Sequence, residues 1–273
     1  MAGRPGGRLI AAAILSTALV LAGLVAACAF SPTPGDGAAA ELTVFAAASL
    51  RGPLKNVATA YEAATGVRLV VATDSSTALR IQVEEGARAD VFLSADTANP
   101  EVLASAGLTD GSIVAFAGNP LAIVVPAGNP AGIVTPADLA RPGIAIVAAA
   151  EGVPVTAYAT ELLERLASLP GYPRNLPAAY AANVVTREDN VRAALAKIEL
   201  GEGDAAIVYA TDATRSDAVD SVAIPTEANV TATYAGVVLL GAADGASAHA
   251  FFEWLAGPAG QAVLAAYGFV AAP

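Results

Sequence analysis

The chain has 273 residues, of which 55% are hydrophobic and 14% are charged, and its formal net charge is −11. That length suits one large domain or two smaller ones. The negative charge argues against nucleic acid as a partner, and the apolar composition confines any disorder to a short N-terminal stretch.

The first 27 residues have the layout of a secretory signal peptide. Arg4 and Arg8 give a positive start, and residues 9–27 form an apolar run that ends in small residues. This order of charged, apolar and small residues is typical of a segment that is removed on export. A retained membrane anchor of about 20 residues is the alternative.

The single cysteine of the chain, Cys28, directly follows LVAA. The stretch LVAAC resembles the bacterial lipobox, whose cysteine is lipidated and becomes the first residue of the mature protein. We expect a lipid anchor at Cys28 ahead of ordinary cleavage, and ordinary cleavage ahead of a retained anchor. One cysteine allows no intrachain disulfide. Residues 28–40 then predict a flexible tether.

From Glu41 onward, the sequence predicts alternating strands and helices. Apolar residues at helical spacing follow the first strand, and Gly86 and Gly107 end the next two helices. The expected strands of this first series are 42–48, 67–73, 89–95 and 120–126, and the expected helices are 50–66, 75–86 and 98–107.

A second series follows from Thr135, which is expected to cap a short helix with Pro136 in its first position. The segment from Arg187 is expected to be a helix with acidic residues in its first turn, as the helix dipole favours. The strands expected here are 143–149, 204–210, 220–225 and 229–241, and the helices are 135–140, 153–169, 187–203, 246–257 and 258–269.

Short strands that alternate with helices predict an α/β fold with mostly parallel sheets. There are too many elements for one small sheet. We therefore expect two halves rich in β–α units, joined by strands near 121–126 and 225–235.

Catalytic and metal-binding motifs are scarce. The chain has one histidine, His249, and no cluster of His, Cys and carboxylates with metal-ligand spacing. A Ser-His-Asp hydrolase would need His249 as its base, but no G-x-S-x-G surrounds any serine. The phosphate-binding loops G-x-x-x-x-G-K-[ST] and G-x-G-x-x-G are also absent from the sequence.

The starts of the predicted helices are more informative. Ser49, the run from Ser75 to Thr77, residues 151–156 and residues 188–191 each open one. Any one of these is an ordinary N-cap. Helix N-termini carry free N–H groups and partial positive charge, so several that converge form an anion site without Lys or Arg. The carboxyl ends of strands in open α/β sheets make such convergence plausible.

Four motifs then occur in order: TVFAAASL, DSSTALRIQVEEGARADVFLSAD, GVPVTAYA and DAAIVYATDA. Together with the C-terminal LAGPAGQAVLAAYGF, they resemble the periplasmic molybdate-binding proteins of bacterial ABC importers, over residues 41–273. The resemblance implies a type II periplasmic binding protein, with two α/β lobes around a hinged ligand cleft. Lobe 1 would comprise 41–121 and 229–273, and lobe 2 would comprise 122–228.

The same resemblance implies a set of neutral donors for a tetrahedral oxyanion. Ser49 and Ser76 would each give a hydroxyl and a backbone N–H, Val155 and Val191 would give backbone N–H groups, and Tyr209 would give its phenol. The family commonly has a smaller residue at the place of Val155 and a shorter loop before Val191. Small residues at 46–48 would let the backbone approach the anion.

These features predict a lipid-anchored extracytoplasmic receptor that captures molybdate or tungstate. It would act without a cofactor, be monomeric, and deliver its ligand to the membrane permease of an ABC importer. Sulfate or another small oxyanion is the alternative ligand. A secreted serine hydrolase is the alternative from a different class, and a structural or adhesion role leaves the helix-opening motifs unexplained.

Overall fold

The computed structural model describes residues 40–273. The predicted signal peptide, the lipidation at Cys28 and nearly all of the tether therefore lie outside the described residues. The described residues belong to one compact unit, so the division into lobes at 121/122 and 228/229 stays a prediction. No helix within 40–273 combines the length and apolar character needed to cross a membrane.

The largest sheet begins with three parallel strands. β1 (Glu41–Ala47) lies between β2 (Arg68–Asp74) and β3 (Val91–Ser94) and is parallel to both. Next come β9 (Thr231–Leu239), antiparallel to β3, and β4 (Thr109–Pro126), antiparallel to β9. The strand order is β2-β1-β3-β9-β4-β7.

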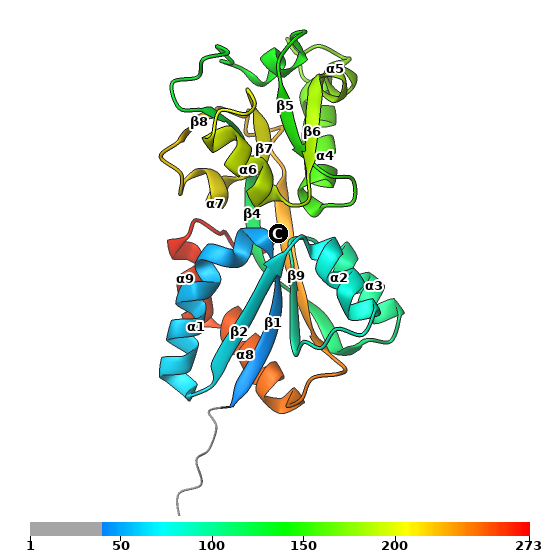
Figure 1. The fold of residues 1–273 in the computed structure, drawn as a ribbon, viewed down its shortest axis with the longest axis vertical. Helices are drawn as coiled ribbons and strands as arrows, with labels where there is room; N and C mark the ends of the chain where they lie inside the picture. The colour runs from blue at the N-terminus through cyan, green and yellow to red at the C-terminus, as the bar shows by residue number, and fades with distance from the viewer. Residues whose placement is uncertain (1–39) are drawn as a thin grey trace, which may run out of the picture. The chain divides into compact units, whose positions relative to one another are not determined.

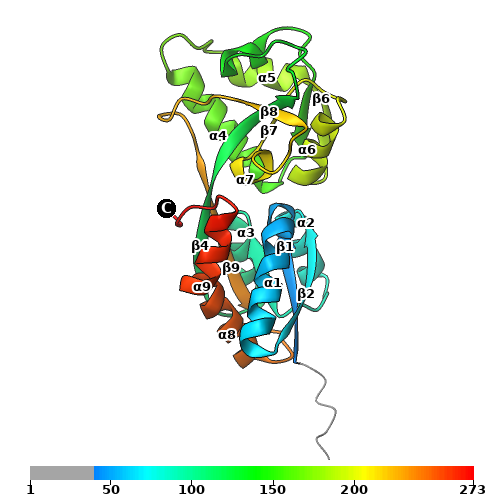
Figure 2. The ribbon, with the colours of Figure 1, turned by 90° about the vertical axis from the view of Figure 1, so that its left-hand side faces the viewer.

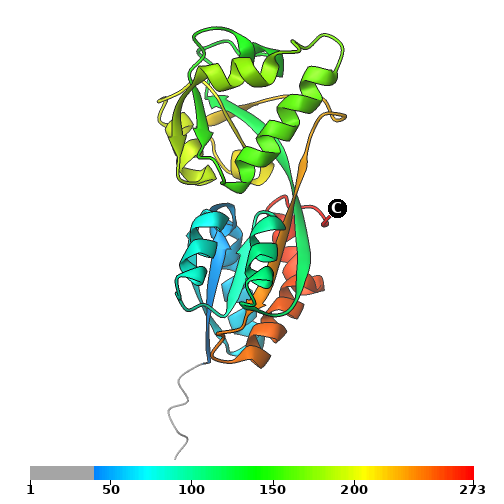
Figure 3. The same cartoon turned by 90° about the vertical axis from the view of Figure 1, so that its right-hand side faces the viewer.

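Helices cover both faces of this sheet. The helices α1 (Arg51–Thr65), α8 (Gly245–Ala256) and α9 (Pro258–Ala266) pack side by side on one face (Figure 2). The helices α2 (Ser76–Glu84) and α3 (Ala98–Ser105) pack together on the other face (Figure 3). On the first face, the ring of Tyr61 makes edge contacts with Phe251 and Trp254, which explains the helical spacing of the apolar residues in α1.

The long strand β4 connects the two halves of the described chain (Figure 1). Its residues 109–120 pair with β9. Its residues 121–126 pair instead with β7 (Ala206–Tyr209) and β8 (Val219–Val222). We call the half that contains β1, β2 and β3 lobe 1, and the half that contains β5, β6, β7 and β8 lobe 2.

Two expectations about the strands need correction. β4 begins at Thr109 rather than near residue 120, because irregular pairing at 110–117 interrupts the alternation that marks a strand in sequence. The large sheet is mixed rather than mostly parallel, because β4 and β9 pass in opposite directions and every pairing with β4 is antiparallel.

Lobe 2 also contains a two-stranded parallel sheet, of β5 (Ile146–Ala149) and β6 (Val184–Glu188). The short helix at Pro136–Ala140 begins, as predicted, at a Thr135 cap. The other helices are α4 (Pro154–Ser168), α5 (Leu176–Asn183), α6 (Val191–Glu199) and α7 (Ala210–Ala213).

The start of α6 differs from the prediction. Arg187 and Glu188, which were expected to open the helix, lie at the end of β6, and no acidic residue occupies the first turn of α6. The side chain of Asn190 instead accepts a hydrogen bond from the Ala193 N–H (3.1 Å) and caps the helix. Both β6 and α5 were absent from the predicted elements, since each is too short for a clear periodicity.

Candidate functional site

A cavity of about 210 Å³ lies where strand ends and helix starts from the two lobes meet. Its lining comprises the end of β1, the starts of α2, α4 and α6, and the end of β7. No lining residue carries a charge. The full set is Ala47, Ala48, Ser49, Ser75, Ser76, Ala95, Val153, Pro154, Asn190, Val191 and Tyr209.

The cavity therefore brings together four of the five predicted site residues: Ser49, Ser76, Val191 and Tyr209. Ala47 and Ala48 lie beside Ser49 in the lining, and their side chains are too small to hold a ligand away from the backbone. The convergence expected from the helix-opening motifs is present in the structure.

Three helices begin at this cavity. α2, α4 and α6 begin at Ser76, Pro154 and Val191, each of which lines the cavity. The first N–H groups of a helix have no acceptor within the helix, and the helix dipole places partial positive charge there. The helix dipoles thus contribute partial positive charge at the cavity without a cationic side chain.

The hydroxyls of Ser76 and Ser49 each make a hydrogen bond with a neighbouring group of the protein. Ser76 Oγ accepts a hydrogen bond from the buried Ala95 N–H (3.0 Å). Ser49 Oγ lies 2.7 Å from the phenolic oxygen of Tyr234. Each serine still has hydrogen-bonding capacity for a group inside the cavity.

The Tyr209 hydroxyl is the least satisfied polar group of the cavity. The residue is 1% exposed, and its hydroxyl oxygen has no hydrogen-bond partner among the described residues. Burial, followed by the nearby Tyr234 phenol, raises the pKa of Tyr209 well above its usual value, so the hydroxyl stays a donor. A buried donor without a partner is costly, which is the pattern expected where a ligand supplies the acceptor.

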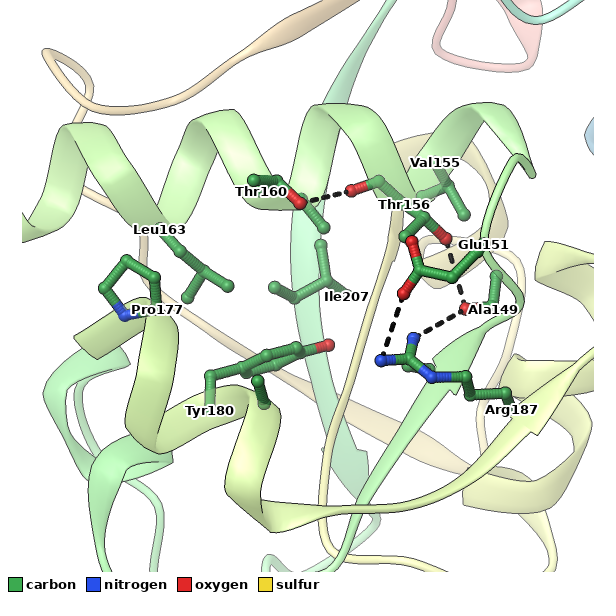
Figure 4. Close-up of a pocket in the computed structure, with 13 residues that line it drawn as sticks. Ala149, Glu151, Val155, Thr156, Thr160, Leu163, Pro177, Tyr180, Arg187 and Ile207 are labelled. Carbon is green, nitrogen blue, oxygen red and sulfur yellow. Dashed lines mark hydrogen bonds and ion pairs between the residues drawn. The ribbon is translucent and has the colours of Figure 1, made fainter. Parts of the chain in front are cut away.

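The side chain of Val155 does not line the cavity. It lines a separate pocket of about 680 Å³ in lobe 2, at the end of that pocket where Thr156 and Glu151 lie (Figure 4). The predicted contribution of Val155 is its backbone N–H, in the first turn of α4, and that contribution stays a prediction.

Two cavity residues with polar side chains were missing from the predicted set, Ser75 and Asn190. Ser75 caps α2 by accepting from the Ala78 N–H (3.1 Å). Asn190 caps α6, and its side-chain amide also donates to Asp74 Oδ1 across the lobes (3.1 Å). Both are N-cap residue types directly before a predicted donor, which is the signal that marks them in the sequence.

A second contact holds the lobes together near the cavity. Thr77 Oγ1 donates to the carbonyl oxygen of Gly152 (2.6 Å), which joins the start of α2 to the loop before α4. Together with the contact between Asn190 and Asp74, it joins the two lobes beside the cavity.

A basic pocket of about 590 Å³ shares Ala48 and Ser49 with the cavity. Four cationic side chains line it: Arg51, Lys55, Arg192 and Arg215. Its single acid, Asp212, is 4% exposed and accepts from Arg192 (3.2 Å). In an acidic protein, this pocket is a local region of positive charge next to the cavity.

Asp212 is electrostatically unusual. Its second oxygen, Oδ2, has no hydrogen-bond partner within residues 40–273. Burial raises the pKa of this carboxyl to about 7, although Arg192 opposes the shift.

His249 lies away from these groups, on α8, where its Nε2 contacts Asp110 Oδ2 (3.1 Å). The part of the chain that the structure describes has no group of three or more His, Cys, Asp or Glu arranged to hold a metal ion. The imidazole that a serine hydrolase would require is thus engaged with Asp110 rather than with Ser49 or Ser76.

Comparison with known proteins identifies the family. A family model described as "Bacterial extracellular solute-binding protein" matches residues 42–270. The molybdate-binding protein ModA of Mycobacterium tuberculosis is 36% identical over 262 residues, which cover 93% of this chain and 95% of that protein. The molybdate-binding protein ModA of Escherichia coli is 32% identical over 238 residues, covering 84% and 88%.

A solved structure agrees with these relatives. The periplasmic molybdate-binding protein of Azotobacter vinelandii superposes with a TM-score of 0.71 at 25% identity, over 85% of this chain and all of that one. The predicted resemblance and the α/β fold of the periplasmic binding proteins are thereby confirmed. The chain belongs to the bacterial extracellular solute-binding protein family.

Proposed function

We propose that this protein captures molybdate or tungstate outside the cytoplasm and delivers it to the membrane permease of an ABC importer. The ligand would occupy the neutral cavity between the lobes. Ser49, Ser76 and Tyr209 would donate through their hydroxyls, and the starts of α4 and α6 would donate through the N–H groups of Val155 and Val191. The similar molybdate-binding proteins support the choice of ligand.

The observation that carries this proposal is the buried Tyr209 hydroxyl. It has no partner in the described part of the chain and lines the same cavity as Ser49 and Ser76. An anion with several oxygens would satisfy the phenol, both serines and the helix N-termini at once. Hydrogen bonds from neutral donors to a charged acceptor are stronger than neutral pairs.

The size and charge of the cavity narrow the ligand class. The cavity, lined by only eleven residues, is smaller than the sites of about 300–1,000 Å³ that hold drug-sized ligands. A bound cation would require oxygen or nitrogen ligands with negative or lone-pair character, such as carboxylates. No carboxylate lines this cavity, which favours a small anion.

The transport role extends the proposal beyond the cavity. An anchor at Cys28 would keep the receptor at the membrane surface, with residues 29–40 as a tether to the permease. The protein would act as a monomer, without a cofactor and without catalysis. Sulfate is the alternative ligand, since it shares the tetrahedral shape and the charge of molybdate. The pairing of His249 with Asp110 disfavours a serine hydrolase.

The test is titration calorimetry of the purified protein with molybdate, tungstate, sulfate and phosphate. We expect molybdate and tungstate to bind most tightly, then sulfate, then phosphate. Phosphate carries a proton, and no carboxylate lines the cavity to accept it. A ligand at a hundred times its Kd adds about 2.7 kcal/mol of stability, a melting shift of roughly 5–10 °C. Equal shifts from phosphate and molybdate, or none from molybdate, would overturn the assignment.

A further inference from the structure

A buried hydrogen-bond network lies behind Ser49. Tyr234, on β9, is fully buried, and its phenolic oxygen is 2.7 Å from Ser49 Oγ. Asn119, on β4, is also fully buried, and its Nδ2 is 3.3 Å from the same phenolic oxygen. The Asn119 amide in turn contacts Thr211 in lobe 2. None of these three partners lines the cavity itself.

The chemistry of the groups sets the direction of each bond. The Thr211 N–H can only donate, so the atom that it meets at 3.4 Å is Oδ1 of Asn119. The other amide atom is therefore Nδ2, which can only donate, to Thr211 Oγ1 (2.8 Å) and to Tyr234. Tyr234 thus accepts from Asn119.

Tyr234 then has one proton left to place. Its ring is packed edge-on against Tyr209 and Phe269, so the hydroxyl cannot turn toward solvent. Were Ser49 the donor in this pair, the phenolic proton would be buried without a partner, which is unfavourable. Donation from Tyr234 to Ser49 satisfies both groups and leaves the serine proton available to the cavity.

From this network we propose that Tyr234 is a positioning residue that holds Ser49 as a hydrogen-bond donor, so that the cavity selects tetrahedral dianions without a proton. This inference rests on the proposed function, because it assumes that Ser49 faces the bound anion. Asn119 fixes the orientation of Tyr234, and the Asn119 contact with Thr211 ties this arrangement to lobe 2.

Ser76 is also held as a hydrogen-bond donor, but by a backbone group. Its oxygen accepts from the Ala95 N–H (3.0 Å), which leaves its proton for the ligand. Both serines are therefore biased toward donation, Ser76 by the backbone and Ser49 by a side chain. At the two serines, an anion that carries a proton meets oxygens that each already accept one hydrogen bond, whereas an unprotonated dianion accepts from both serines.

The phenol of Tyr234 keeps its proton under all ordinary conditions. Burial, followed by the negative potential of Asp212, raises the pKa of Tyr234 well above its usual value, against the opposing effect of its hydrogen bonds with Ser49 and Asn119. The bias on Ser49 is therefore expected to be independent of pH wherever the protein is folded.

The experiment compares Tyr234→Phe with the matched control Tyr180→Phe. Tyr180 is a buried tyrosine of α5 in lobe 2 and does not line the cavity. Molybdate affinity is measured by calorimetry, and phosphate affinity by competition against molybdate. Melting temperatures without ligand report any loss of folding.

We expect Tyr234→Phe to weaken molybdate binding by about 2- to 10-fold, because Ser49 is then free to rotate and to accept. Phosphate binding should be unchanged or stronger, so the preference for molybdate over phosphate falls. Asn119→Ala should act in the same direction with a smaller effect. Tyr180→Phe should leave both affinities at the wild-type value.

A purely structural role for Tyr234 would weaken both anions alike, and that outcome overturns the inference. Molybdate affinity in Tyr234→Phe equal to that of the wild type would overturn it as well. If phosphate does not displace molybdate from the wild type or from any variant, molybdate affinity alone decides. Weaker molybdate binding by a Tyr234→Phe variant that melts at the wild-type temperature then supports the inference. Failure of the wild type to bind molybdate would instead reject the proposed function, so the two failures are distinguishable.

Discussion

Replacing Tyr209 by Phe should separate the effect of its hydroxyl on folding stability from its effect on ligand binding. The Tyr209 hydroxyl is buried without a partner in the described chain, and an unsatisfied buried group costs about 1–3 kcal/mol. Removing it should leave the ligand-free protein as stable as before or more stable. The same change should weaken molybdate binding by about 1.5–3 kcal/mol, the range for a hydrogen bond to a charged group, or about 10- to 150-fold in Kd.

Ser76→Ala provides the contrast. Ser76 Oγ accepts from the buried Ala95 N–H, so its removal leaves that N–H without a partner. The ligand-free protein should then lose about 1–3 kcal/mol of stability, while molybdate binding weakens by a similar amount. Thus Tyr209→Phe and Ser76→Ala should both reduce affinity but differ in their effect on the free protein.

Denaturant unfolding without ligand and calorimetry with molybdate measure the two quantities independently. A clear loss of ligand-free stability in Tyr209→Phe would refute the reasoning, because it would mean that the hydroxyl has a partner in the free protein. Unchanged molybdate affinity in Tyr209→Phe would show that the phenol does not contact the ligand.

Three further outcomes are expected. Cys28→Ala should abolish fatty-acid labelling and release the protein from the membrane, and an unlabelled wild type would contradict the anchor. The raised pKa of Asp212, about 7 when folded, means that the folded state holds this proton more tightly than the unfolded chain. The difference in free energy of unfolding between the wild type and the Asp212→Asn variant should therefore favour the wild type most at low pH. This advantage should decline as the pH rises toward 7, by at most about 4 kcal/mol. Unfolding free energies that change with pH in parallel for the two proteins would contradict this. The double variant Arg51→Gln/Arg215→Gln should slow molybdate association by about 10-fold at low salt, with little change in dissociation, because the basic pocket attracts the anion. The control Arg88→Gln, which lies outside the basic pocket, should leave the association rate unchanged. Equal association rates for the double variant and the wild type in stopped-flow measurements would argue against this electrostatic attraction.

Local chemistry in the sequence accounts for much of the fold and of the site. Pro154 in the first position of α4 and the Thr135 cap are where their residue types predict. Ser49 and Ser76 follow directly from the motifs that open helices. The segments that failed were short or irregular: α5, β6 and the first half of β4 have no clear period, and Asn190 moved the start of α6 past the acidic residues.

The sequence by itself determined where α2 and α4 begin and which residues there carry neutral donors, because capping and helix polarity depend on neighbours a few positions away. It also determined the family, through motifs such as DSSTALRIQ and DAAIVYATDA. The tertiary structure alone decided that these starts meet in one cavity, that Tyr209 is buried without a partner, and that Tyr234 and Asn119 lie behind Ser49. Those contacts join residues up to 185 positions apart, and their formation depends on the pairing of β4 with β9 and on the packing of both lobes, which no local pattern encodes.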